Sequence, residues 1–231
     1  MAKPRSALKP KNWLAGLALG LWGVVMIHAW GSGRLNLLVQ SDFQLLVLAA
    51  GIALAALGLL SLAKANQTPA GGRPWPELVM LGTGLAVLIL PPQPSLSTLA
   101  ANRSTANLGG PSLSFLSPPQ ERSLTDWVRL LRQQPDPQLH AGDPVRVSGF
   151  VLAVPGQAPE IARLLVRCCL ADATPVGLPV RWPAGQPWPK PDSWLEVKGT
   201  MGVQPWQGGS RTILLTNSVR SIPQPSRPLE P

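Results

Sequence analysis

The chain has 231 residues, of which 45% are hydrophobic and only 13% are charged. A soluble domain usually carries about 25% charged residues, so the composition indicates that part of the chain lies in lipid. Twenty-seven prolines exclude an all-helical bundle, and two adjacent cysteines, Cys168 and Cys169, exclude a disulfide scaffold and a four-cysteine zinc site.

Three apolar segments before residue 93 are predicted to be transmembrane helices, over about residues 14–30, 45–63 and 75–92. Each approaches the 17–25 residues or so that cross a hydrocarbon core. Trp13 and Trp30 bracket the first segment, as expected of indoles at the membrane interface. A cleaved signal peptide is the alternative there, although no small-residue cleavage site follows. The third segment is long enough to cross the membrane only if it extends as far as Pro92. The alternative interpretation is a buried core helix.

The distribution of basic residues predicts the membrane topology. Residues 1–12 contain four Lys or Arg and no acid, and the loop after the second segment contains Lys64 and Arg73. The positive-inside rule assigns both regions to the cytoplasm. A third crossing then places everything after residue 92 outside. We therefore expect a multi-pass protein of the bacterial inner membrane with an extracytoplasmic C-terminal domain; with two crossings that domain would be cytoplasmic.

Small residues recur at spacings of three and four on the first two segments, and such stripes let helix backbones approach closely. Packing within one helical hairpin is one interpretation, and docking against another membrane protein is the other. The residues are Gly16, Gly20 and Gly23 in the first segment and Gly51, Ala55 and Gly58 in the second. His28, near the outer end of the first segment, is either a functional group or a hydrated interfacial one.

Residues 93–120 are rich in Ser, Asn, Gly and Pro and predict a linker, followed by a domain over 121–223 and a tail over 224–231. Ser123 and Asp126 have the spacing of a capping box, and the apolar residues from Leu124 to Leu131 predict a short helix. Five strands are then expected, each bounded by Gly or Pro, over residues 144–154, 161–171, 176–182, 194–203 and 212–222. Gly149 marks a bulge or bend in the first strand.

These elements predict a membrane-anchored α + all-β protein, with three N-terminal transmembrane helices, a short helix and a five-stranded small barrel of the OB type. The segment Cys168-Cys-Leu-Ala-Asp172-Ala, together with the upstream Gly-Phe-Val of residues 149–151, resembles the YcgQ-type family of uncharacterised membrane proteins. The resemblance implies N-terminal membrane helices, a linker and a β-rich domain with a Cys-Cys-x-Ala-Asp-Ala segment. It also implies a separate multi-spanning permease as partner, linked in some members to metal supply, and no assigned catalytic residues.

The chemistry of the cysteine pair depends on the local backbone. In a regular strand, neighbouring side chains point to opposite faces, which would separate the thiols of Cys168 and Cys169. A bulge or turn toward Asp172 would instead gather two sulfurs and a carboxylate, a ligand set suited to zinc. A buried structural thiol with an exposed neighbour, and a redox pair, are the alternatives.

We therefore expect a protein that is not an enzyme: an accessory subunit of a permease, embedded in the lipid bilayer and assisting transport of a small solute or metal ion. The first alternative is a membrane-anchored metal-binding or sensing module that uses Cys168, Cys169 and Asp172, and the second is an OB-type ligand-binding module. The sequence has no Gly-x-Ser-x-Gly, Walker loop or His-Glu-x-x-His. Nucleic acid is not an expected partner, because the distribution of the net charge of +9 fits membrane topology better than a phosphate-binding patch.

Overall fold

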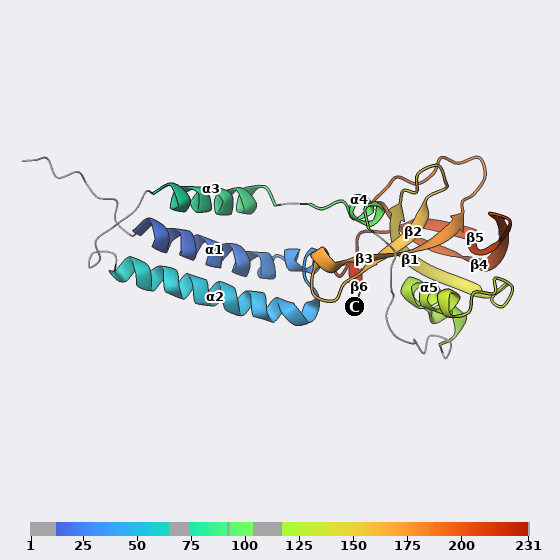
Figure 1. Ribbon diagram of the computed structural model, residues 1–231, viewed down its shortest axis with the longest axis horizontal. Helices are drawn as coiled ribbons and strands as arrows, with labels where there is room; N and C mark the ends of the chain where they lie inside the picture. Colours follow the sequence, from blue (N-terminus) through green and yellow to red (C-terminus); the bar gives the residue numbers. More distant parts are fainter. Residues whose placement is uncertain (1–12, 65–73, 92, 104–116, 231) are drawn as a thin grey trace, which may run out of the picture. The chain divides into compact units, whose positions relative to one another are not determined.

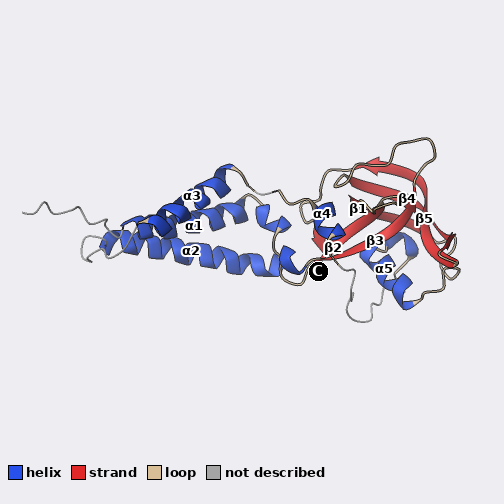
Figure 2. Ribbon diagram, turned by 45° about the horizontal axis from the view of Figure 1, so that its top comes forward, coloured by secondary structure: helices blue, strands red, loops and turns tan. Residues whose placement is uncertain are grey.

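The computed structural model describes residues 13–64, 74–91, 93–103 and 117–230. The basic N-terminal tail, Arg73 and the middle of the predicted linker lie outside these ranges. The chain divides into two compact units, Met1–Gln93 and Pro94–Pro231. The first is helical and the second is built around a β-sheet (Figures 1 and 2).

The helical unit is based on a hairpin of two long apolar helices (Figure 1). Helix α1 covers Trp13–Gly31, a short 3-10 helix η1 covers Arg34–Leu37, and α2 covers Ser41–Lys64. With 19 and 24 residues, α1 and α2 are long and apolar enough to cross a membrane; at a rise of about 1.5 Å per residue they measure roughly 28 and 36 Å. The first two predicted membrane helices therefore exist as helices that could span a bilayer.

Glycines bring the backbones of α1 and α2 into contact. A Cβ atom added at Gly23 would lie 2.6 Å from the backbone nitrogen of Ala55, and one added at Gly58 would lie 2.6 Å from that of Gly20. Real Cβ atoms do not approach backbone so closely, so only glycine fits either position. The predicted small-residue stripes therefore pack against each other within the hairpin.

Helix α3, Trp75–Ile89, is shorter than the predicted third span of residues 75–92. Its 15 residues extend about 22 Å, less than the roughly 30 Å of a hydrocarbon core, so a third transmembrane helix is not confirmed. The helix ends because Leu90 precedes Pro91, which disfavours helical backbone at Leu90; its ψ is 75°. The indole N–H of Trp22 donates to the carbonyl of Met80 at 3.1 Å and fixes α3 against α1.

The second unit contains a closed barrel of five strands, which confirms the predicted small barrel. The strand order is β1-β4-β5-β3-β2, and pairing of β1 with β2 closes the ring. All neighbours are antiparallel except β3 and β5. The strands cover Pro144–Leu152 (β1), Glu160–Leu165 (β2), Thr174–Arg181 (β3), Trp194–Trp206 (β4) and Gly209–Ser221 (β5).

Two glycines shape this barrel. A Cβ at Gly149 would lie 2.5 Å from the carbonyl oxygen of Ala162, so the glycine allows the backbones of β1 and β2 to approach closely. A bulge or bend was predicted at Gly149, but the register of β1 with β4 continues through Gly149 without a shift, and the irregular register lies between Lys198 and Gly199 on the β4–β5 ladder. The β4–β5 hairpin turns through Gln207 and Gly208, both with positive φ, which is the geometry that tight hairpins favour.

Helix α5, Leu124–Gln133, begins with the predicted capping box: the Ser123 side chain accepts from the Asp126 N–H, and the Asp126 side chain accepts from the Ser123 N–H. The helix follows a single 3-10 turn, η3, over Pro119–Glu121. Its apolar face packs on the main barrel core, where Trp127 is fully buried. Trp127 is thus a core residue.

Two elements lie where no structure was predicted. Helix α4, Leu96–Ala101, falls within the predicted linker of residues 93–120, and strand β6, Leu229–Glu230, falls within the predicted tail of residues 224–231. The carboxylate of Asp192 holds α4 by accepting from the Ser95 hydroxyl and the Ser97 N–H, each at 2.6 Å. Strand β6 pairs in parallel with β2. Both segments therefore belong to the folded unit.

Candidate metal centre

Cys168 and Cys169 lie in a turn, not in the strand predicted over residues 161–171. Strand β2 ends at Leu165, and a 3-10 turn, η4, covers Leu170–Asp172. The Asp172 carboxylate makes this turn: Oδ1 accepts from the N–H of Arg167 and Oδ2 from the N–H of Cys168, each at 2.9 Å. Because the side chain takes the hydrogen bonds that a ladder would make, the strand stops.

The turn brings both sulfurs to the same side. The Sγ atoms of Cys168 and Cys169 are 3.5 Å apart, and the thiols are free and half-buried. One ligand atom from each of Cys168, Cys169 and Asp172 lies within 4.8 Å of the others. The expectation from regular strand alternation, that the two thiols point to opposite faces, is therefore wrong. The structure contains the turned arrangement that the sequence left as its alternative.

The spacing of the sulfurs suits a tetrahedral ion. Zinc binds thiolate at about 2.3 Å, which separates two sulfurs of a tetrahedral site by about 3.8 Å. The observed 3.5 Å is close to that value. Ligation would draw the carboxylate oxygen, which lies within 4.8 Å of both sulfurs, closer to them. Three protein ligands leave a fourth position open, as in zinc sites that exchange a ligand.

The electrostatics favour a neutral Cys168 thiol in the absence of a cation. Hydrogen bonds to Asp172 and Cys169, together with burial and the nearby negative charges, raise the pKa of Cys168 to about 12. Burial opposes ionisation of Asp172, but hydrogen bonds from the Cys168 thiol and from three backbone N–H groups lower its pKa overall. A divalent cation would supply the missing positive charge and displace the thiol proton, because metal ligation requires the thiolate.

The histidine of the second unit does not join this cluster. His140 is buried beside α5, where Nδ1 lies 3.0 Å from Oδ2 of Asp143 and Nε2 lies 3.0 Å from Oε1 of Gln134. Its ring meets Trp127 edge-on, with centroids 5.8 Å apart. Both ring nitrogens are therefore occupied in the α5 core.

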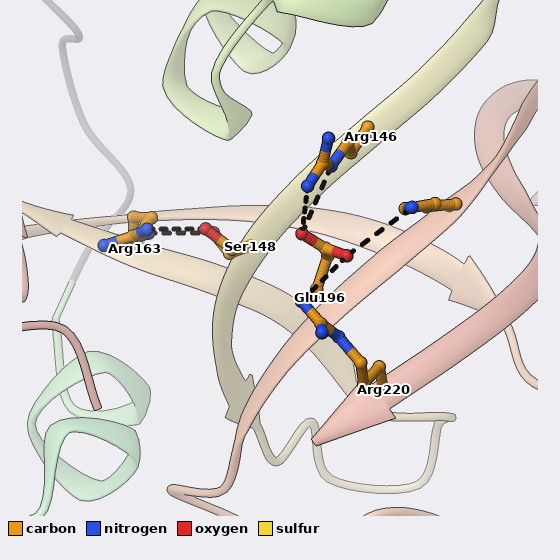
Figure 3. Close-up of polar contacts among 6 residues, drawn as sticks. Arg146, Ser148, Arg163, Glu196 and Arg220 are labelled. Carbon is orange, nitrogen blue, oxygen red and sulfur yellow. Dashed lines mark hydrogen bonds and ion pairs between the residues drawn. The ribbon is translucent and has the colours of Figure 1, made fainter. Parts of the chain in front are cut away.

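A second polar cluster, which sequence reasoning missed, lies on β1, β4 and β5 (Figure 3). Glu196 accepts from Nη2 of Arg146 at 2.9 Å and lies 3.8 Å from Lys198 and 3.4 Å from Arg220. The hydrogen bond from Arg146 and the surrounding cations lower the pKa of Glu196 despite opposing desolvation. The three cations are exposed, so this network is a solvated surface feature. The residues of this network are brought together by the pairing of β1, β4 and β5, and the register of that pairing cannot be read from the sequence.

A buried arginine ties the same region to the chain's final strand. Arg163 donates through Nε to the carbonyl of Ser148 and through Nη2 to its hydroxyl, each at 2.8 Å (Figure 3). Its Nε also lies 3.3 Å from Oε1 of Glu230. The guanidinium carbon is 4.8 Å from the centre of the Trp194 ring, an arrangement that stabilises a cation. These contacts are structural and do not reach the cysteines.

Residues 121–229 match the family described as the DUF1980 C-terminal domain. No curated protein and no solved structure matches the chain. The matched range begins just before α5, runs through the barrel and includes Cys168, Cys169 and Asp172. The chain therefore carries a DUF1980 C-terminal domain, consistent with an uncharacterised family.

Proposed function

We propose that this chain is a membrane-anchored module whose C-terminal domain binds a divalent metal ion at Cys168, Cys169 and Asp172. The observation that supports this proposal is the convergence of their ligand atoms within 4.8 Å. Two soft sulfurs and one carboxylate favour zinc over magnesium or calcium, which prefer oxygen ligands alone. The open fourth position suits an ion that is passed on, since closed four-ligand sites are typically structural.

Metal content of the full-length protein in mild detergent tests the proposal. We expect about one zinc per chain in the wild type and none in the Cys168→Ser/Cys169→Ser variant. Asp136→Asn is a matched control for Asp172→Asn, because Asp136 also accepts a backbone N–H, from Gln138 at 3.0 Å, but has no cysteine neighbour. Equal zinc content in the wild type and the double serine variant contradicts the site.

A second candidate is a YcgQ-type accessory subunit of a separate multi-spanning permease, assisting transport of a small solute or of the same metal ion. The apolar surface of the helical unit favours it: Leu59 on α2 and Ile89 on α3 are 69% and 67% exposed and require either lipid or partner helices as cover. A mild-detergent pull-down with identification by mass spectrometry tests this. A preparation consistently free of any multi-spanning partner counts against it.

The placement of the domain outside an inner membrane is part of the same proposal and has its own test. Labelling of intact cells with a membrane-impermeant thiol reagent should reach Cys168 or Cys169, the only cysteines in the chain. Labelling that appears only after lysis, with denatured controls to account for burial, contradicts an outside location.

A further inference from the structure

A cavity of about 220 Å³ lies in the helical unit, between the C-terminal part of α1, the η1 turn and the end of α3. Its walls are mostly apolar and include Val25, Leu37, Val87 and Leu88, whereas His28 and Arg34 supply polar groups. An apolar cavity of about 150 Å³ is enough for a benzene ring, so this one accommodates a short length of hydrocarbon. It is smaller than the roughly 300–1,000 Å³ of a drug-sized site.

Arg34 gives the cavity its charge preference. Among the described residues that line the cavity, it is the one formally charged side chain, and none of them is Asp or Glu. Within the described part of the chain, Arg34 makes no ion pair and no side-chain hydrogen bond. A half-buried guanidinium without an anion beside it attracts one, and its planar fork suits a phosphate in particular.

The position of the cavity along α1 suggests an amphiphile. Trp30, which is 44% exposed, lies on the same last turns of α1 as His28. Tryptophans at the ends of apolar helices prefer the depth of lipid headgroups. The cavity thus has hydrocarbon-lined walls and a cation close to the depth at which lipid phosphates lie.

We propose that this cavity binds an anionic phospholipid, with the phosphate at Arg34 and the adjoining hydrocarbon between Val25, Val87 and Leu88. The proposal rests on the helical unit lying in a bilayer, and it is independent of the cysteine cluster. A phospholipid fits better than free phosphate, because the apolar walls contribute only if the ligand carries hydrocarbon.

The test is native mass spectrometry of the full-length protein in mild detergent, with equal amounts of phosphatidylglycerol and phosphatidylcholine. We expect the wild type to retain phosphatidylglycerol preferentially. Arg34→Gln should lower the ratio of the two lipids about fivefold, the effect of one basic residue near an anionic headgroup. Lys64→Gln is the matched control, since it removes the same charge at the opposite end of α2 and does not line the cavity.

Ala29→Leu provides a second variant, because Ala29 lines the cavity and a larger side chain would fill part of it. It should reduce retention of both lipids while leaving Arg34 in place. Equal retention of the two lipids by the wild type, an equal effect of Lys64→Gln and Arg34→Gln, or full retention by Ala29→Leu each overturns the proposal. Displacement of the lipid by inorganic phosphate alone would also overturn it. Zinc content should be unchanged in Arg34→Gln, so this proposal and the metal proposal fail separately.

Discussion

The backbone N–H of Cys168 donates to Oδ2 of Asp172 at 2.9 Å, and the ligand atoms of the two side chains lie within 4.8 Å of each other. The aspartate therefore both shapes the turn and helps to raise the pKa of the Cys168 thiol. These two effects are separable, because an asparagine at position 172 keeps one acceptor oxygen but loses the negative charge.

Asp172→Asn should make Cys168 more reactive in the metal-free protein. The wild-type pKa of about 12 leaves very little thiolate near neutral pH, and removal of the charge should lower that pKa. We expect alkylation by iodoacetamide at about pH 8 to accelerate roughly tenfold or more, as followed by peptide mass spectrometry. An unchanged rate contradicts the argument. An equal acceleration at Cys169 would show instead that the turn has opened.

Gly23→Ala should destabilise the helical hairpin, because the new methyl group would meet the backbone nitrogen of Ala55 at 2.6 Å. Overpacking of this kind costs about 1–3 kcal/mol. Gly20→Ala on the same helix is the matched control: its Cβ meets nothing within 4 Å, so better helix propensity should make it neutral or stabilising by up to about 1 kcal/mol. Unfolding midpoints in detergent compare the two. Equal midpoints would mean that α1 and α2 do not pack through Gly23.

Glu230→Gln should cost more stability than Glu196→Gln. The Glu230 carboxylate pairs with Arg163 at 3.3 Å, where the two side chains are 22% and 11% exposed, and it also accepts from the Thr125 hydroxyl. Loss of this carboxylate partner of the Arg163 guanidinium should lower the free energy of unfolding by about 1–3 kcal/mol.

Glu196 faces exposed cations, so its loss should cost below about 1 kcal/mol and diminish further with added salt. Chemical denaturation of both variants at low and high salt gives the comparison. A larger loss of stability in Glu196→Gln than in Glu230→Gln would contradict the conclusion that the Glu230 pair is buried and the Glu196 network is solvated.

Glu160→Gln should stabilise the protein at neutral pH. Burial raises the pKa of Glu160 above its usual 4.5, and attraction to Arg211 offsets this only in part. The folded state therefore binds the proton more tightly than the unfolded state. The stability that protonated Glu160 contributes is fully present below about pH 4.5 and is lost as pH rises through the raised pKa.

The stability difference between Glu160→Gln and the wild type should thus be largest near pH 7 and should vanish toward pH 4. Thermal unfolding at a series of pH values measures it. A difference that grows as the pH falls would contradict the sign of the pKa shift.

Elements whose signals are local could be predicted from the sequence. The apolar lengths of α1 and α2, the Ser123–Asp126 capping box and the five strands between Gly and Pro positions all depend on residues close together in the chain. Elements that are stabilised by residues distant in the sequence could not be predicted. Helix α4 is held by Asp192, and β6 exists through its pairing with β2.

The candidate site was predicted in its residues but not in its geometry. The rule that strand side chains alternate is sound, but it applies only as far as the ladder continues. The Asp172 side chain ends that ladder by accepting the N–H groups of Arg167 and Cys168. The end of α3 was missed for a similar local reason, because Leu90 takes its conformation from the proline that follows it.

The parallel pairing of Leu164 with Leu229 sets the order in which the second unit can be completed during synthesis. Strand β2 is made about 65 residues before β6, and at roughly 5–20 residues per second the ribosome needs about 3–13 s to deliver its partner. Throughout that interval, the edge of β2 and the Arg163 guanidinium have no C-terminal partner. The five-stranded ring can close through β1 and β2 before β6 is made, so only the short stretch of β2 at Leu164 and Leu165 keeps an unpaired edge until Glu230 has left the ribosome.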